Sequence, residues 1–176
     1  MYRIKNEERW IRKSLESASQ ICESIVILDD GSTDNTVKIC KEFDIVKKIQ
    51  TQKNESMDIV RDANKILKMA MNQNPDFLLR LDGDEIIQPK IRDSLEEEIN
   101  LLYPESSIFE FQSFHLWDKP NQYRSDGMYP NLWHPILLRL KNQPNDLKFL
   151  PYSGSKLHPS LIPTNAIGWE KPIRSK

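Results

Sequence analysis

Residues 25–34 read IVILDDGSTD, four apolar residues followed at once by a turn that is rich in acidic and small residues. A short, continuous apolar run of this kind is typical of a parallel strand that is buried on both faces. Asp29 and Asp30 then stand at the carboxyl end of that strand. Open α/β sheets bind their ligands outside the carboxyl ends of the strands, so this turn is a candidate ligand site.

The segments on either side alternate between helix and strand. Apolar residues recur at helical spacing in residues 8–19 and 58–73, and a further helix is expected at 35–43. Residues 45–50 are expected to form a second strand, and residues 77–81 a short apolar one. Strand and helix in this alternation predict a mostly parallel sheet that is covered by helices.

Three side chains are expected to mark the beginnings of helices. Asn6 and Asp34 can cap the first two helices, because their short polar side chains accept hydrogen bonds from backbone N–H groups. Pro89 suits the first turn of a further helix that runs through Leu102.

The strand at 77–81 also ends in an acidic turn, which contains Asp82, Gly83 and Asp84. Two carboxylates two positions apart can turn toward one cation, and the glycine between them leaves room for a diphosphate. Hard oxygen ligands together with a phosphate suit Mg²⁺ or Mn²⁺. A polar loop with a helix cap could explain either acidic turn alone, but two such turns at strand ends favour a ligand site.

After residue 102 the sequence changes in character. Residues 108–117 and 133–140 are strand-like, and the proline-rich segment beyond residue 142 is expected to be irregular. We therefore predict a single domain over residues 1–176, with a nucleotide-binding half at 1–102 and a smaller half of strands and loops at 103–176.

The composition argues against several classes of protein. The 25 basic and 26 acidic residues give a formal net charge of −1, which argues against nucleic-acid binding. No apolar run approaches the roughly 18 residues of a membrane span, and the first residues are acidic where a signal peptide would be apolar. Cys22 and Cys40 form no C-x-x-C pair, and we expect reduced thiols in a cytoplasmic protein.

Four motifs together resemble the family 2 glycosyltransferases of the GT-A fold. They are KNEE at residues 5–8, IVILDDGSTD at 25–34, Arg61 near the start of a helix, and LDGDE at 81–85. The resemblance covers residues 1 to about 90 in order and spacing. It implies an α/β GT-A fold and the transfer of a sugar from a nucleoside diphosphate to an acceptor hydroxyl with inversion. UDP-sugars are the favoured donors, with dTDP- and GDP-sugars as alternatives.

The resemblance also assigns site residues. Asp30 is expected to accept a hydrogen bond from the base, typically the imide of uracil, and Asp82 to lie near the ribose. The residues expected to bind the nucleotide are Glu7, Asp30, Arg61, Asp82 and Gly83, and Asp84 is expected to bind the Mn²⁺ or Mg²⁺ ion. Glu7 and Arg61 also have structural explanations, as a charge at a helix N-terminus and as an ion-pair partner of Asp58 or Asp62.

An inverting transferase also needs a base for the proton of the acceptor hydroxyl. The first candidate is Asp126, which lies in a loop between aromatic residues, although an Asp-Gly turn explains this residue equally well. The family often carries a His-Glu pair late in the domain. Here Pro159 stands at the position of the acid, which leaves His158 as a second candidate, and Asp118 and Glu110 follow.

Other interpretations remain open. The short first strand at residues 2–4 and the early end of the chain favour a truncated acceptor side, so a non-catalytic nucleotide-sugar or glycan-binding module is the first alternative. A Mg²⁺-dependent phosphoryl-transfer enzyme is the second, disfavoured because the expected Gly-Thr does not follow Asp84. The resemblance implies a glycan or lipid-linked acceptor and peripheral association with the inner face of the membrane. The side chains that either stack on the acceptor or pack in a core are Trp117, Tyr123, Tyr129 and Trp133.

Overall fold

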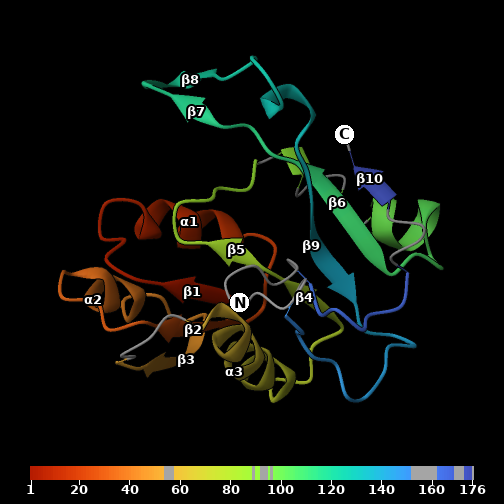
Figure 1. The fold of residues 1–176 in the computed structure, drawn as a ribbon, viewed down its shortest axis with the longest axis horizontal. Helices are drawn as coiled ribbons and strands as arrows, with labels where there is room; N and C mark the ends of the chain where they lie inside the picture. The colour runs from red at the N-terminus through yellow and green to blue at the C-terminus, as the bar shows by residue number, and fades with distance from the viewer. Residues whose placement is uncertain are drawn as a thin grey trace.

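The computed structural model describes residues 1–53, 58–88, 90–91, 95, 97–151, 162–168 and 173–175 (Figure 1). The strands are β1 (Tyr2–Ile4), β2 (Ile25–Asp29), β3 (Val46–Thr51), β4 (Phe77–Leu79), β5 (Leu81–Asp82), β6 (Ile108–Gln112), β7 (Leu116–Trp117), β8 (Lys119–Tyr123), β9 (Trp133–Arg139) and β10 (Ile173–Ser175). The helices are α1 (Ile11–Ala18), α2 (Thr36–Cys40), α3 (Ile59–Met71), the π-helix η1 (Glu98–Leu102) and the 3-10 helix η2 (Tyr129–Asn131).

The first sheet is parallel throughout, in the order β3-β2-β1-β5. Its central strand β2 is buried on both faces. Ile25 and Ile27 pack in one core cluster with residues of α1 and α2, while Val26 and Leu28 pack in another with residues of α3. The continuous apolar run therefore has the role that the sequence predicts, because helices cover both faces of the sheet.

The strand predicted at 77–81 is in fact two strands that belong to different sheets. β4 pairs antiparallel with β9, whereas β5 pairs parallel with β1. The change occurs at Arg80, whose backbone N–H donates to the Ile136 carbonyl at 2.9 Å. Leu78 and Leu81 pack in separate core clusters, so one apolar run serves both sheets.

The second sheet has the order β10-β6-β9-β4, and only its β10–β6 pair is parallel. Strand β10 lies in the segment that was expected to be irregular. The prediction of a single strand over residues 108–117 is also wrong. The strand ends at Gln112, and a separate hairpin of β7 and β8 follows, which Figure 1 shows apart from both sheets. Trp117 and Tyr123 in this hairpin are 63% and 54% exposed and belong to no core.

Of the predicted helix caps, the structure contradicts Asn6, whereas Asp34 bonds to the first turn of its helix. Asn6 does not cap α1, whose N-cap position is Trp10 without a side-chain hydrogen bond. Asp34 precedes the N-cap of α2 by one residue and accepts a hydrogen bond from the Thr36 N–H at 3.0 Å. The helix predicted from Pro89 to Leu102 lies partly outside the described residues, and its last five residues form η1. None of the helices in the described ranges is long and apolar enough to cross a membrane.

Candidate nucleotide-binding site

Three loops meet at one edge of the parallel sheet because β1, β2 and β5 end there. Ile4 is in register with Asp29, and Arg3 is in register with Asp82. The loop that carries the KNEE motif therefore begins between the two acidic turns. All three loops follow carboxyl ends of strands, where open α/β sheets bind ligands.

The loop after β1 is fixed against the loop after β2 by hydrogen bonds. The Glu7 N–H donates to Thr36 Oγ1 at 2.7 Å, and the Thr33 N–H donates to Asn6 Oδ1 at 2.8 Å. Asn6 and Gly31 have left-handed φ angles of 56° and 76°, a conformation that Asn and Gly adopt more readily than other residues. The backbone of this side of the site is thus set by the protein itself.

The acidic turn after β5 is closed by Glu85. Its Oε2 accepts the Asp82 N–H at 2.9 Å, and its own N–H donates to the Asp82 carbonyl at 3.1 Å. The buried hydroxyl of Ser14 in α1 donates to the Glu85 carbonyl at 2.5 Å. Asp82 and Asp84 are exposed, and Gly83 between them is buried. Glu85 is therefore a structural residue that leaves the two aspartates at the surface.

Glu7 packs directly on Gly83, since a Cβ on that glycine would lie 2.7 Å from Glu7 Cγ. Partial burial, together with the charges of Asp84, Asp34 and Asp82, raises the pKa of Glu7. In the described part of the chain no three His, Cys, Asp or Glu residues form a ready metal cage. The donor set still suits Mg²⁺ or Mn²⁺, which proteins often hold by one or two carboxylates together with substrate phosphates.

On the other side of the KNEE loop, Asp30 belongs to a network of charged and polar side chains. Arg3 Nη2 donates to Asp30 Oδ2 at 2.7 Å, and Gln52 Nε2 donates to Asp30 Oδ1 at 3.3 Å. Lys65 Nζ donates to Gln52 Oε1 at 2.6 Å, and Arg3 Nε donates to the buried Asp62 at 3.3 Å. The network holds the Asp30 carboxylate from both sides.

Arg61 lies in the first turn of α3, behind the cap formed by Asp58. Asp58 Oδ1 accepts the Arg61 N–H at 2.9 Å, and Arg61 Nε donates to Asp62 Oδ1 at 3.0 Å. The ion pair with Asp62, expected as the structural alternative, is therefore present. Arg61 Nη2 also lies 3.0 Å from Asp62 Oδ1, so two nitrogens of the guanidinium face the buried carboxylate.

Asp126 stands apart from this edge. It follows β8 and is held by Arg124, whose Nη2 and Nε donate to its two oxygens at 2.6 and 3.0 Å. This pairing lowers the pKa of Asp126, which weakens the carboxylate as a base. Its charge interactions within the described residues are with Arg124 and not with the acidic turn. An open groove of about 720 Å³ adjoins it, lined by Trp117, Asn121, Gln122, Tyr123, Arg124, Ser125 and Asp126. His158 lies outside the described residues.

His134, which the sequence suggests as a packing residue or a substrate contact, also lies in this region. The pairing of β9 with β6 places His134 opposite Phe111, and Asp82 is near enough for its charge to act on the ring. Its Nδ1 lies 3.1 Å from the Ser113 hydroxyl. Burial and the nearby His115 lower the pKa of His134, so the ring is neutral at pH 7. Only the pairing of two strands distant in sequence reveals this position.

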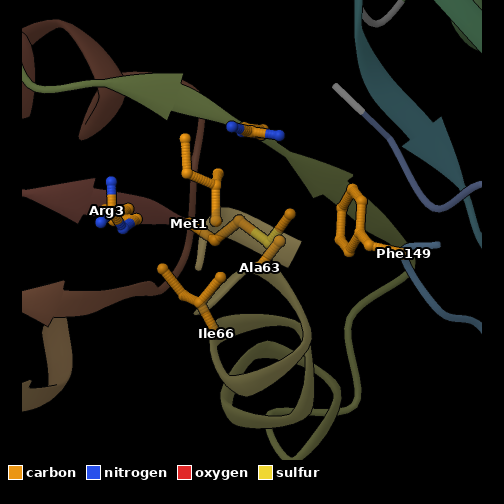
Figure 2. A pocket seen from close by; sticks show the side chains of 7 residues that line it. Met1, Arg3, Ala63, Ile66 and Phe149 are labelled. Atoms are coloured by element: carbon orange, nitrogen blue, oxygen red, sulfur yellow. The ribbon is translucent and has the colours of Figure 1, made fainter. Parts of the chain in front are cut away.

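A small cavity lies beside the Asp30 network, between β1, α3 and the junction of β4 with β5 (Figure 2). Its volume is about 10 Å³, which is room for about one water molecule and not for a nucleotide. A nucleotide would have to bind over the exposed edge. The residues that line the cavity are Met1, Arg3, Ile59, Ala63, Ile66, Arg80 and Phe149.

Comparisons with known proteins agree with this arrangement. Residues 4–146 match the family model described as Glycosyl transferase family 2. No curated protein matches the chain. S. aureus TarS 1-349 is similar in structure, with a TM-score of 0.56 and 19% identity over 85% of this chain and 49% of that chain. The same fragment in complex with UDP gives a TM-score of 0.55 and 18% identity over 89% and 52% of the two chains.

This chain thus spans about half the length of TarS 1-349, and at such identity the likeness concerns the fold. The family model covers most of the chain, including both acidic turns and α3. The α/β GT-A architecture that the resemblance implied is confirmed by the parallel sheet with its covering helices. The chain belongs to glycosyl transferase family 2.

Proposed function

We propose that this domain transfers a sugar from a nucleoside-diphosphate donor, a UDP-sugar, to an acceptor hydroxyl with inversion, and that it uses Mn²⁺ or Mg²⁺. The observation that carries the proposal is that Asp30, the carboxylate expected to bind the base, lies at the same sheet edge as the acidic turn that contains Asp82 and Asp84. Membership of the family favours glycosyl transfer over the phosphoryl-transfer alternative.

The surroundings of Asp30 support a uracil-type base. Uracil presents an N–H donor between two carbonyl acceptors, and the complementary surface is an acceptor between donors. Asp30 supplies the acceptor, and Arg3 and Gln52, which each donate a hydrogen bond to it, carry further N–H groups for the two carbonyls. Thymine shares this pattern, whereas cytosine has an acceptor in place of the N–H.

The acidic turn supports the metal and the diphosphate. Asp84 and Asp82 are exposed next to Glu7, whose raised pKa reflects the crowding of negative charge. A divalent cation bound here would offset the charge that develops on the departing nucleoside diphosphate. Gly83 leaves room for Glu7 beside the two exposed aspartates, and the resemblance assigns Arg61, which is paired with Asp62, to the nucleotide. These residues orient the donor so that the bond to the sugar faces the acceptor.

The candidate acceptor groove is formed by residues of the β7–β8 hairpin and the loop after it. Asp126 and His158 stay the predicted candidates for the base, and the groove beside Asp126 offers aromatic and amide side chains to a glycan. By resemblance, we propose a glycan or lipid-linked acceptor and action in the cytoplasm, at the inner face of the membrane. The ion pair that lowers the pKa of Asp126 favours one alternative, a domain that binds the nucleotide sugar without transferring it.

Calorimetric titration tests the proposal. Wild type, Asp84→Ala and Asp44→Ala are titrated with UDP, dTDP and GDP, each in the presence of Mn²⁺ or of EDTA. We expect micromolar, Mn²⁺-dependent binding of UDP that is lost in Asp84→Ala and kept in Asp44→Ala, which changes an exposed aspartate elsewhere. Failure of all three nucleotides to bind folded wild type would refute the proposal. Binding without hydrolysis of UDP-sugars would favour the non-catalytic alternative.

A further inference from the structure

A single buried carboxylate holds both arginines of the nucleotide edge. The side chain of Asp62 is 0% exposed. Its Oδ2 accepts a hydrogen bond from Arg3 Nε at 3.3 Å, and its Oδ1 accepts one from Arg61 Nε at 3.0 Å. A buried carboxylate is costly unless it is paired, and here the two partners come from different elements, β1 and α3. Asp62 therefore connects the strand that leads into the KNEE loop with the helix that carries Arg61.

Arg3 carries this connection on to Asp30. It uses Nε for Asp62 and Nη2 for Asp30, at 3.3 and 2.7 Å. Because a guanidinium is a rigid, planar group, fixing one of its nitrogens also fixes the direction of the others. Arg3 also lines the small cavity, together with Met1 and Ile66 (Figure 2).

We propose that Asp62 is a positioning residue for base recognition, acting through Arg3 on the carboxylate of Asp30. The inference rests on the proposed function, in which Asp30 accepts the N–H of a uracil-type base. Asp62 keeps Arg3 directed at Asp30 Oδ2, while Gln52 holds Oδ1 from the other side. The carboxylate then has one orientation before the nucleotide arrives, so its hydrogen bond to the base is formed without reorganisation.

A purely structural role for Asp62 leads to a different expectation. If Asp62 only stabilises the packing of α3 on the sheet, its loss weakens the binding of every nucleotide alike. A positioning role acts on the base alone. UDP and CDP share ribose and diphosphate, but cytosine lacks the N–H that Asp30 would accept. The ratio of the two affinities therefore separates the two roles.

The experiment measures the dissociation constants of UDP and CDP, with Mn²⁺ present, by calorimetry. The proteins are wild type, Asp62→Asn, Arg3→Lys and the matched control Arg12→Lys, which alters an exposed ion pair with Glu42. We expect wild type and Arg12→Lys to bind UDP at least about tenfold more tightly than CDP, as a hydrogen bond to a charged group would give. In Asp62→Asn and Arg3→Lys the preference should fall below about threefold, mainly through loss of UDP affinity.

Arg3→Lys keeps the positive charge, but its single ammonium cannot replace the guanidinium that bonds to Asp62 and Asp30 through different nitrogens. If Asp62→Asn does not fold, this variant tests whether the connection sets the preference for UDP. A preference for UDP that persists in folded variants would overturn the positioning role while leaving the proposed function intact. Wild type that binds neither nucleotide would overturn the proposed function, and this inference with it.

Discussion

Replacing Gly83 with alanine should separate the acidic turn from Glu7. The added Cβ would lie 2.7 Å from Glu7 Cγ and 3.2 Å from Glu7 Cβ, whereas carbon atoms pack at about 3.5–4.0 Å. The Glu7 backbone is held by Thr36 Oγ1 at 2.7 Å, so its side chain must move. A side chain forced off its rotamer costs about 0.5–1.5 kcal/mol, and an extra methyl in a packed site about 1–3 kcal/mol. We expect Gly83→Ala to lower the free energy of unfolding by about 1–2 kcal/mol.

Gly127→Ala is a matched control for this experiment. Gly127 has a φ of 58° and no neighbouring atom within 4 Å of an added Cβ, so alanine there is strained only in its backbone, by about 1 kcal/mol. Urea denaturation compares the stability of the two variants, and calorimetry with UDP and Mn²⁺ compares their binding. Gly83→Ala should bind UDP at least tenfold more weakly, which is about 1.4 kcal/mol, while Gly127→Ala should bind as wild type does.

One result would refute this reasoning. If Gly83→Ala loses less than about 0.5 kcal/mol and binds UDP like wild type, Glu7 moves aside at no cost. The packing of Glu7 on Gly83 would then be incidental, and the carboxylate of Glu7 would lie outside the nucleotide site. A loss of stability without a loss of binding would lead to the same conclusion about the site.

Two further substitutions test the electrostatics and the packing. Glu7→Gln should be more stable than wild type at pH 7 and equal to it below pH ~4. Folding raises the pKa of the Glu7 carboxylate, so ionisation of this group opposes folding as the pH rises through that pKa. Urea denaturation at both pH values measures the difference in the free energy of unfolding. Asn64→Ala removes the side chain whose Oδ1 and Nδ2 bond to the N–H and carbonyl of Phe149, both at 2.9 Å. It should cost about 1–3 kcal/mol and speed hydrogen exchange in residues 147–151, and unchanged exchange there would contradict the role of this contact.

The parallel sheet could be predicted because its strands and helices carry local signals. The strand expected from the four apolar residues that begin at Ile25 is observed at Ile25–Asp29, and the helix expected at 58–73 is observed at Ile59–Met71. In both segments the apolar spacing reports which faces are buried, and Asp58 marks the beginning of α3 as its cap. The two acidic turns were found for the same reason, since each directly follows such a strand.

The second sheet could not be predicted in this way because its pairing joins distant segments. Nothing within residues 77–81 shows that the chain leaves one sheet for another at Arg80, since an apolar run suits either sheet. The prediction that Asn6 caps the first helix is wrong for a related reason. The residue type and position of Asn6 favour a helix cap, but its side chain bonds to the Thr33 N–H, 27 residues away. In both cases a long-range contact outweighs a local preference.

Asp62 shows which local signal could have revealed more of the site. Residues 62, 66 and 69 recur at helical spacing, and Asp62, Ile66 and Met69 are all buried in the structure. An acidic residue within the apolar stripe of a helix must be paired, because an isolated buried carboxylate is too costly. The same stripe covers the parallel sheet, and Asp62 is paired both with Arg3 of β1 and with Arg61 of its own helix. A charged residue in the buried stripe of a helix therefore indicates an ion pair at the contact of that helix with its neighbour. Here the ion pair of Asp62 with Arg3 lies next to the carboxylate of Asp30.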